Sequence, residues 1–218
     1  MTEGAGSQSS VRGRVAWQHL APPLLLAAFL AAIAIVTGAF GDELTRRVVT
    51  LMLINLTMVV GLQAFMGNSG VASFGQVGFM LLGAYGTVLL TLTGPEKSFI
   101  LRKMPRDWLL HELHLPFVAA LLVAALIVSI AAAVIGIPLL RIGSTAFGLT
   151  SFAFLVVIRI VAVSSDALTN GTRTLVGIPR LTDLLMVTVF AIVFVICAYL
   201  FKESRWGLQL RASREETR

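Results

Sequence analysis

The sequence predicts an all-α membrane protein, a polytopic bundle of about six transmembrane helices. Of its 218 residues, 57% are hydrophobic and only 13% are charged, and the mean hydropathy is +0.89. Soluble domains carry roughly 25% charged residues. The apolar residues gather in runs, several of them near the roughly 20 residues that cross a bilayer as a helix. A soluble core of this size does not need so many long uncharged runs.

The net charge of +6 comes from 17 Lys and Arg against 11 Asp and Glu. In a soluble protein this excess would suggest nucleic acid as a partner. Here the basic residues lie between apolar runs and in the tail, where anionic headgroups and membrane orientation explain them. We therefore expect a lipid membrane and no nucleic acid. The single cysteine, Cys197, lies inside an apolar run and excludes an internal disulfide.

Taken in order, the chain begins with a polar stretch, residues 1–19, that predicts a disordered cytoplasmic leader. The apolar run after it is longer than a signal-peptide core, so we interpret it as a span and not as a cleavable signal. The predicted transmembrane domain covers residues 20–201, and residues 202–218 form a charged tail. The predicted spans are about 20–40, 48–66, 71–93, 116–140, 146–163 and 184–201. A Gly-Asn-Ser-Gly turn at 67–70 separates the second span from the third, and this turn either leaves the membrane or re-enters it.

The longest stretch between spans, Gly94 to Leu115, mixes charges with Trp108 and several leucines. This composition is typical of a segment that lies on the membrane surface. Its charged residues are Glu96, Lys97, Arg102, Lys103, Arg106, Asp107 and Glu112. His111 and His114 have a spacing that two helical metal ligands can use, but no cysteine or third imidazole lies close in sequence. We expect no metal site.

The most informative stretch runs from Asn55 to Tyr85, because it is apolar yet rich in glycine and polar residues. If Gly67 to Gly86 is one helix, Ser69, Ser73 and Gln76 share a face. We assign that face to a translocation path, with Asn68 and Tyr85 beside it. The glycines would instead permit close helix packing; they are Gly67, Gly70, Gly75, Gly78, Gly83 and Gly86. The alternative is that the hydroxyls bond back to their own helix.

This stretch also carries a resemblance. Its residues follow the pattern N-x5-G…G-x-x-G-x-x-S-x-G-x3-F-x3-G-A-Y, which resembles the signature of the branched-chain amino-acid ABC importer permeases. The matching residues are Asn55, Gly61, Gly67, Gly70, Ser73, Gly75, Phe79, Gly83, Ala84 and Tyr85. Ten positions in fixed register are more specific than hydropathy alone.

A second block resembles the family but departs from it. The agreeing residues are Arg141, Phe154, Arg159, Thr169, Gly171, Ile178 and Pro179. Val156 stands where the family has an acid, so Arg159 lacks its expected partner three residues earlier. Arg159 then either snorkels to the interface or points inward, and the missing acid favours snorkelling.

The tail is the third block. It resembles the cytoplasmic coupling segment by which such permeases dock on their ATPase. The residues that we assign to ATPase coupling are Arg205, Gly207, Arg211, Arg214 and Glu215. A solvated charged tail is the alternative. Six spans counted back from a cytoplasmic tail place the amino terminus in the cytoplasm. The positive-inside rule does not decide the orientation in the membrane, because each side holds eight basic residues under this topology.

The resemblance implies the permease subunit of an ATP-driven importer for branched-chain amino acids or related small polar solutes of the amide or urea type. It implies no catalytic residue and no cofactor, and a bacterial inner-membrane location. The implied partners are a second permease subunit, cytoplasmic ATPase subunits and an extracytoplasmic solute-binding protein. Family permeases continue with about four more spans, so the chain resembles an amino-terminal portion. A truncated or degenerate subunit without transport activity is the alternative. Ion-driven transport would need acids inside the spans, and there are none.

Overall fold

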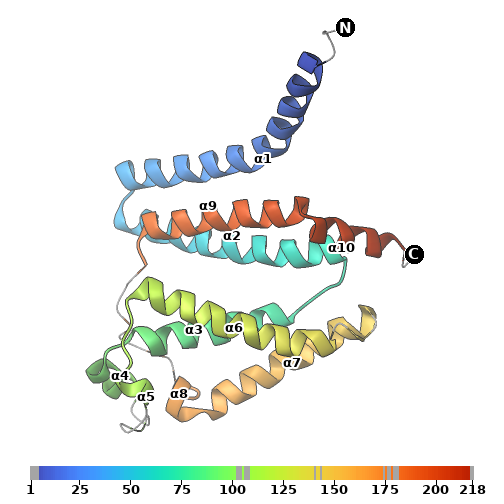
Figure 1. Cartoon of the computed structure of the whole chain (residues 1–218). Coiled ribbons are helices and arrows are strands. Elements are labelled where there is room, and N and C mark those ends of the chain that lie inside the picture. The colour runs from blue at the N-terminus through green and yellow to red at the C-terminus, as the bar shows by residue number, and fades with distance from the viewer. Residues whose placement is uncertain are drawn as a thin grey trace. The chain divides into compact units, whose positions relative to one another are not determined.

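The computed structural model describes residues 5–101, 105, 109–139, 141–142, 144–173, 175, 178 and 182–216. The elements in these residues are helices (Figure 1). They are α1 (Ala5–Phe40), α2 (Glu43–Ser69), α3 (Gly75–Thr91), α4 (Gly94–Ile100), α5 (Leu109–Glu112), α6 (Phe117–Leu139), α7 (Ser144–Ser164), α8 (Asp166–Thr169), α9 (Leu184–Glu203) and α10 (Arg205–Glu216). The predicted all-α fold is confirmed.

Five of these helices are long and apolar enough to cross a membrane: α2, α6, α9, the part of α1 from Ala21 to Phe40, and the part of α7 from Ala146 to Ser164. The predicted polytopic bundle is therefore confirmed. The third predicted span, 71–93, is longer than the helix that the structure has there. Only Gly75–Thr91 is helical there, and 17 residues extend over roughly 26 Å, less than the roughly 30 Å of a hydrocarbon core.

The prediction of a disordered leader is wrong, because the backbone is already helical from Ala5, where α1 begins. No proline occurs before Pro22, so nothing in this stretch removes a helical hydrogen bond. Pro22 and Pro23 lie inside α1, and the apolar span begins just before them. The composition of the leader was therefore a poor guide to its secondary structure.

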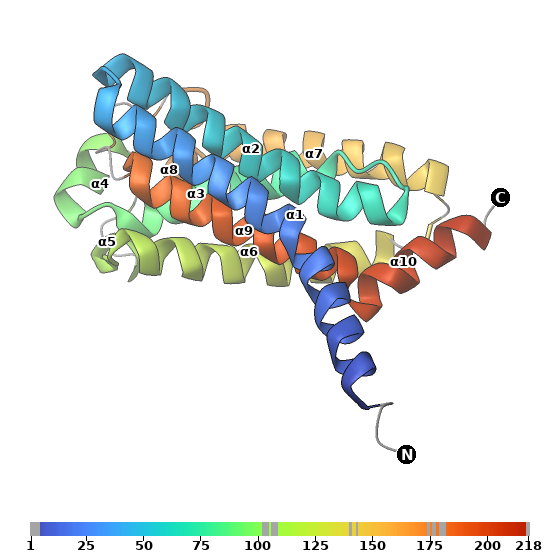
Figure 2. The ribbon, with the colours of Figure 1, turned by 90° about the horizontal axis from the view of Figure 1, so that it is seen from above.

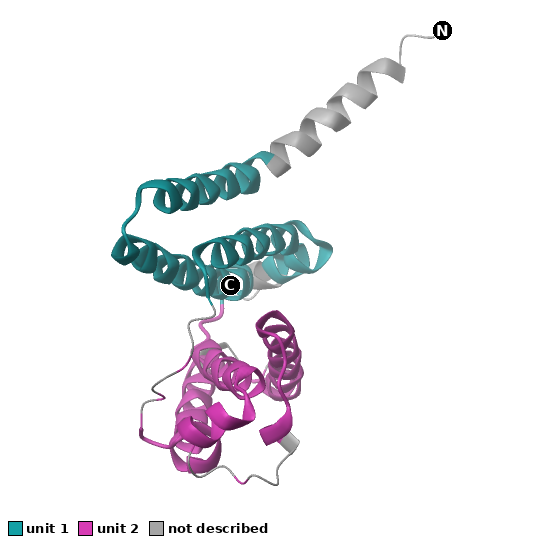
Figure 3. Ribbon diagram, turned by 90° about the vertical axis from the view of Figure 1, so that its left-hand side faces the viewer, with its two compact units in different colours: residues 1–70, 182–218 teal, residues 71–181 magenta. Residues whose placement is uncertain are grey.

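Helices α1, α2 and α9 lie side by side (Figures 1 and 2). They belong to the first of two compact units, residues 1–70 and 182–218 (Figure 3). Leu30 of α1 and Leu53 of α2 are 2% and 0% exposed, and they pack with the inner face of α9. Helix α10 turns back onto α2 and α9. One apolar core therefore holds the three spans together.

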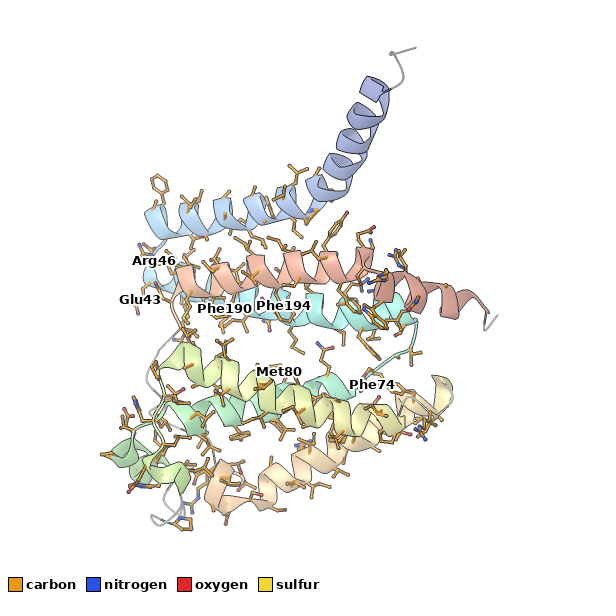
Figure 4. The ribbon with its side chains drawn as sticks, viewed as in Figure 1. Glu43, Arg46, Phe74, Met80, Phe190 and Phe194 are labelled. Atoms are coloured by element: carbon orange, nitrogen blue, oxygen red, sulfur yellow. The ribbon has the colours of Figure 1, made fainter. Side chains whose placement is uncertain are left out.

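The turn from α1 to α2 is closed by an arginine. Arg46 donates from Nε to the Gly41 carbonyl at 3.1 Å and from Nη2 to the Gly38 carbonyl at 2.7 Å. These carbonyls belong to the end of α1, where helical partners are missing and the dipole favours a cation. Figure 4 labels Arg46 and Glu43 at this turn.

The second unit comprises residues 71–181. In it α3 packs against both α6 and α7. Leu90 of α3 and Ala120 and Ala124 of α6 form one buried cluster, and the Leu115 amide donates to the Leu90 carbonyl at 2.9 Å. The small side chains of α6 permit α3 to approach closely, as is usual between membrane helices.

Candidate functional site

A break separates the second and third predicted spans, but it lies at residues 70–74 and not at 67–70, so Gly67 to Gly86 is not one helix. α2 continues through Asn68 and Ser69, and Gly70 ends it in the left-handed conformation, with φ 70° and its N–H bonded to the Met66 carbonyl at 2.9 Å. This conformation is costly for residues with a Cβ, so glycine suits the position. Residues 70–74 are not helical, and α3 begins at Gly75.

The break corrects the argument that placed three path residues on one helix face. Ser69 is the last residue of α2, Ser73 lies in the break, and Gln76 lies in the first turn of α3. The spacing of i, i+4 and i+7 has no meaning across a non-helical segment. Ser73, Gln76 and Tyr85 are each partly exposed within the chain. Their assignment to a path stays a prediction.

Two of the proposed path residues bond to their own helix. The Asn68 side chain is 5% exposed and donates from Nδ2 to the Ala64 carbonyl at 2.7 Å. The Ser69 hydroxyl donates to the Phe65 carbonyl at 2.8 Å. Both bonds follow the local back-bonding that was the alternative for these residues. At Asn68 this bond and the burial favour a structural role over a path.

The glycines of α3 divide between two neighbours. A Cβ at Gly75 would lie 3.5 Å from Phe154 of α7, and one at Gly78 would lie 3.0 Å from Cδ1 of Ile158. Gly86, in contrast, faces Ala124 of α6, 3.5 Å from an added Cβ. At Gly83 the nearest atom of α6 is 4.0 Å away, and at Gly67 an added Cβ would meet only the Gln63 side chain of the same helix.

A residue that the sequence did not single out lies beside the break. Ser151 of α7 is 1% exposed. Its hydroxyl accepts from the Phe74 amide at 3.1 Å and donates to the Gly148 carbonyl at 2.9 Å. Figure 4 labels Phe74 where the chain enters α3. A lone serine in an apolar span gives no periodic signal, and its partner is 77 residues away.

The expected surface segment contains α4 and α5; its residues 102–104 and 106–108, including Arg102, Lys103, Arg106, Asp107 and Trp108, lie outside the described part. Lys97 is fully buried, and its Nζ donates to the Leu110 and Leu113 carbonyls, each at 2.6 Å. Burial lowers the pKa of Lys97. The His111 Nε2 lies 3.0 Å from the Ser98 hydroxyl.

A capping box starts α4. The Thr93 amide and hydroxyl both donate to Glu96, each at 2.8 Å, and these bonds lower the pKa of the Glu96 carboxyl. The reciprocal pairing satisfies amides that the first turn of a helix leaves without partners. The described residues of the segment after α3 are thus joined by hydrogen bonds.

The tail forms an elbow between α9 and α10. Gly207 is buried, and a Cβ there would lie 2.3 Å from the Phe201 carbonyl oxygen and 2.7 Å from that of Lys202. Arg211 donates from Nη2 to the Lys202 carbonyl and from Nε to the Gly207 carbonyl. These two residues, assigned from sequence to ATPase coupling, are thus engaged within the elbow.

The outer surface of the elbow is apolar and basic. Trp206 is 71% and Leu208 is 53% exposed, and Arg205 between α9 and Trp206 is exposed as well. The backbone of α10 continues to Glu216. The side chains of Arg214 and Glu215 lie outside the described part. A helix with large apolar side chains exposed beside cations is able to bind a partner of complementary charge.

Comparison with known proteins identifies the family. Residues 44–218 match the family described as "Branched-chain amino acid transport system / permease component". The chain belongs to this family. The permease component is 26% identical over 157 residues to the high-affinity branched-chain amino acid transport system permease protein LivM of Escherichia coli (strain K12), and 25% identical over 157 residues to LivM of Salmonella typhimurium (strain LT2).

The aligned residues cover 71% of this permease component and 32% of each LivM protein, so they span about a third of the length of these relatives. No solved structure matches the chain. The family match includes the break after α2, Ser151 and the α9–α10 elbow. Together with the five candidate spans, it makes the chain a multi-pass membrane protein of transport type.

In this permease component, Arg159 is exposed on α7, five residues before the helix ends at Ser164. Val156, at the position where the resemblance leads us to expect an acid, is exposed too. Snorkelling of Arg159 to the interface stays a prediction.

Proposed function

We propose that this chain is a permease subunit of an ATP-driven importer in the bacterial inner membrane, for branched-chain amino acids or related small polar solutes of the amide or urea type. The observation that carries the proposal is the non-helical segment between α2 and α3 within the family match. Its partners would be a second permease subunit, cytoplasmic ATPase subunits and an extracytoplasmic solute-binding protein. ATP would be hydrolysed on the ATPase subunits.

The break supports a polar path for a physical reason. α3 alone covers roughly 26 Å, about 4 Å less than a hydrocarbon core. Residues 71–74, which are apolar except for Ser73, would supply the missing length. Non-helical backbone would then lie within the membrane. Such backbone is tolerated only where protein or a water-filled cavity covers it. Interrupted helices in transporters also place polar backbone ends at the substrate site.

Substrate chemistry fits the side chains that we assign to the path. Ser73 and Gln76 carry neutral donor and acceptor groups, and the Ser69 hydroxyl, whose proton bonds to the Phe65 carbonyl, adds an acceptor. Such groups suit the charged ends of a zwitterion or an amide without trapping an ion. Alternating access would arise from two states of the spans, biased by ATP and by substrate. A side-chain catalyst is not required for this process.

Uptake in cells that express the complete transporter tests the path. We expect Gln76→Leu to abolish uptake of radiolabelled leucine, isoleucine and valine, and of urea and short amides, while membrane insertion and ATPase co-purification persist. The matched control is Gln63→Leu in α2, where the exposed glutamine has no assigned role. Uptake by Gln76→Leu at the wild-type rate would remove Gln76 from the path.

The coupling role of α10 is tested separately. We expect Arg214→Glu to weaken co-purification of the ATPase, because charge reversal opposes the complementarity of the docking surface. Arg47→Glu, an exposed arginine in the first turn of α2, is the control. Unchanged co-purification would make the tail a solvated helix. Association without uptake of any solute in the wild type would support the non-transporting alternative.

A further inference from the structure

We propose that Ser151 is the positioning residue of the break: its hydroxyl fixes the non-helical segment before α3 and thereby the placement of Ser73 and Gln76. The inference rests on the proposed function for its consequence in transport. The anchoring itself depends only on contacts inside the second compact unit.

The direction of the hydrogen bonds gives Ser151 its specific role. A serine hydroxyl has one proton, and here that proton is directed to the Gly148 carbonyl at 2.9 Å. A lone pair is then left to accept from the Phe74 amide at 3.1 Å. Phe74 is the residue before α3, and its amide has no place in the helical hydrogen-bond pattern. Without Ser151 this amide would lack its acceptor.

The surrounding contacts hold the hydroxyl and the amide in register. A Cβ at Gly148 would lie 3.6 Å from the Ala72 carbonyl oxygen, and one at Gly75 would lie 3.7 Å from Cβ of Ser151. The break therefore runs directly along α7 on both sides of Phe74. These distances correspond to ordinary van der Waals contact, and Ser151 supplies the polar group at this contact.

Two aromatic pairs lie near the anchor, which is the hydrogen bond from the Phe74 amide to the Ser151 hydroxyl. The Phe74 and Phe152 rings meet edge to face, with centroids 6.1 Å apart and an interplanar angle of 87°. The Phe79 and Phe154 rings have centroids 5.1 Å apart. Such pairs fix the mutual position of two elements but do not satisfy a backbone amide. The aromatic pairs thus set the register, and Ser151 supplies the acceptor that the break requires.

The placement matters because the predicted path residues flank the anchored amide. Ser73 immediately precedes Phe74, and Gln76 follows it by two residues. If the Phe74 amide loses its acceptor, the backbone that carries both side chains can take other conformations. Solute binding should then weaken, while the spans themselves stay assembled through their apolar contacts.

Hydrogen–deuterium exchange followed by mass spectrometry tests the anchor on the full chain in lipid nanodiscs. We expect Ser151→Ala to speed exchange of the peptide covering residues 71–78 by about tenfold, equivalent to about 1.4 kcal/mol. Ser151→Thr keeps the hydroxyl and should restore slow exchange. Thr150→Ala is the matched control, because that hydroxyl bonds only to the Ala146 carbonyl of its own helix, at 2.8 Å. If Ser151→Ala does not accumulate, Ser151→Cys, whose thiol is a weak acceptor, should give faster exchange as well.

Unchanged exchange at 71–78 in Ser151→Ala, or an equal increase across α6 and α7, would overturn the anchor. Uptake by the assembled importer gives a second reading. We expect Ser151→Ala to raise the KM for uptake by about tenfold with little change in kcat, and Thr150→Ala to change neither. If the wild type transports nothing while the exchange result holds, the proposed function fails and the anchor stands. If uptake is normal and exchange is unchanged, the anchor fails alone.

Discussion

Gly207→Ala should displace α10 from the end of α9. The added Cβ would lie 2.3 Å from the Phe201 carbonyl oxygen, 2.7 Å from the Lys202 carbonyl oxygen and 3.0 Å from the Lys202 carbonyl carbon. All three obstacles are backbone atoms, so no side chain can rotate away. Since the closest common carbon–oxygen contacts are about 3.3 Å, the two helix ends must separate by about 1 Å.

The energetic cost follows from two opposing effects. Overpacking of this kind costs about 1–3 kcal/mol, and rigid backbone obstacles place it near the upper value. Alanine recovers up to about 1 kcal/mol through its better helix propensity. The net loss of about 2 kcal/mol would reduce the docked population of α10 by roughly thirtyfold. The Arg211 hydrogen bond to the Lys202 carbonyl of α9 would be lost with it.

Two measurements on the same variant check this expectation. Deuterium exchange across residues 205–216 should become faster, and co-purification with the ATPase should fall. Gly136→Ala in α6 is the matched control, because a Cβ there meets nothing within 4 Å. Slow exchange of α10 in Gly207→Ala would refute the steric reasoning. Fast exchange with undiminished co-purification would show that the elbow exists but does not serve ATPase binding.

Three further predictions concern helix ends and the segment between α3 and α6. The pKa of Glu96 is lower in the folded state than its ordinary value of 4.5. The Glu96 carboxylate therefore stabilises the fold above about pH 4.5, and this stabilisation is lost as the pH falls through the lower folded pKa. The melting temperature of the wild type should thus exceed that of Glu96→Gln at pH 7, and this difference should vanish in acid. Lys97→Met leaves the Leu110 and Leu113 carbonyls without their donor and should lower stability by about 1–3 kcal/mol in chemical unfolding, whereas the exposed Lys202→Met should not. Arg46→Met removes both bonds to the end of α1 and should cost about 1–2 kcal/mol by the same measurement; equal stability would show that water replaces the guanidinium.

The long spans were predictable because transfer of apolar side chains into lipid depends on composition and length alone. The predicted span 116–140 corresponds to α6 at Phe117–Leu139, and the span 184–201 corresponds to α9 at Leu184–Glu203. The glycine-rich stretch was also recognisable as unusual. Its interruption was predicted as a turn at residues 67–70 between two spans. The structure instead continues α2 through Ser69 and leaves residues 70–74 non-helical, and the run from Val71 to Tyr85 contains no proline that would mark this later break.

The roles of individual residues were likewise predictable from the sequence only in part. Asn68 and Gln76 have the same amide group, but Asn68 is 5% exposed and bonded to its own helix, and only the fold shows this. Gly207 and Arg211 stood out in the tail, and the structure engages both in an elbow that the sequence motif does not describe. A motif records which residue types occur at a spacing, whereas hydrogen-bond partners depend on the path of the backbone.

The sequence by itself determined that this is a polytopic helical permease component, because hydropathy and a family motif are local properties of the chain. Only the tertiary structure decided that the break covers residues 70–74 and that Ser151 accepts from the Phe74 amide. A backbone amide outside a helix must find an acceptor in an apolar environment. Which residue supplies that acceptor depends on how α7 packs against the break, and no local pattern contains that contact.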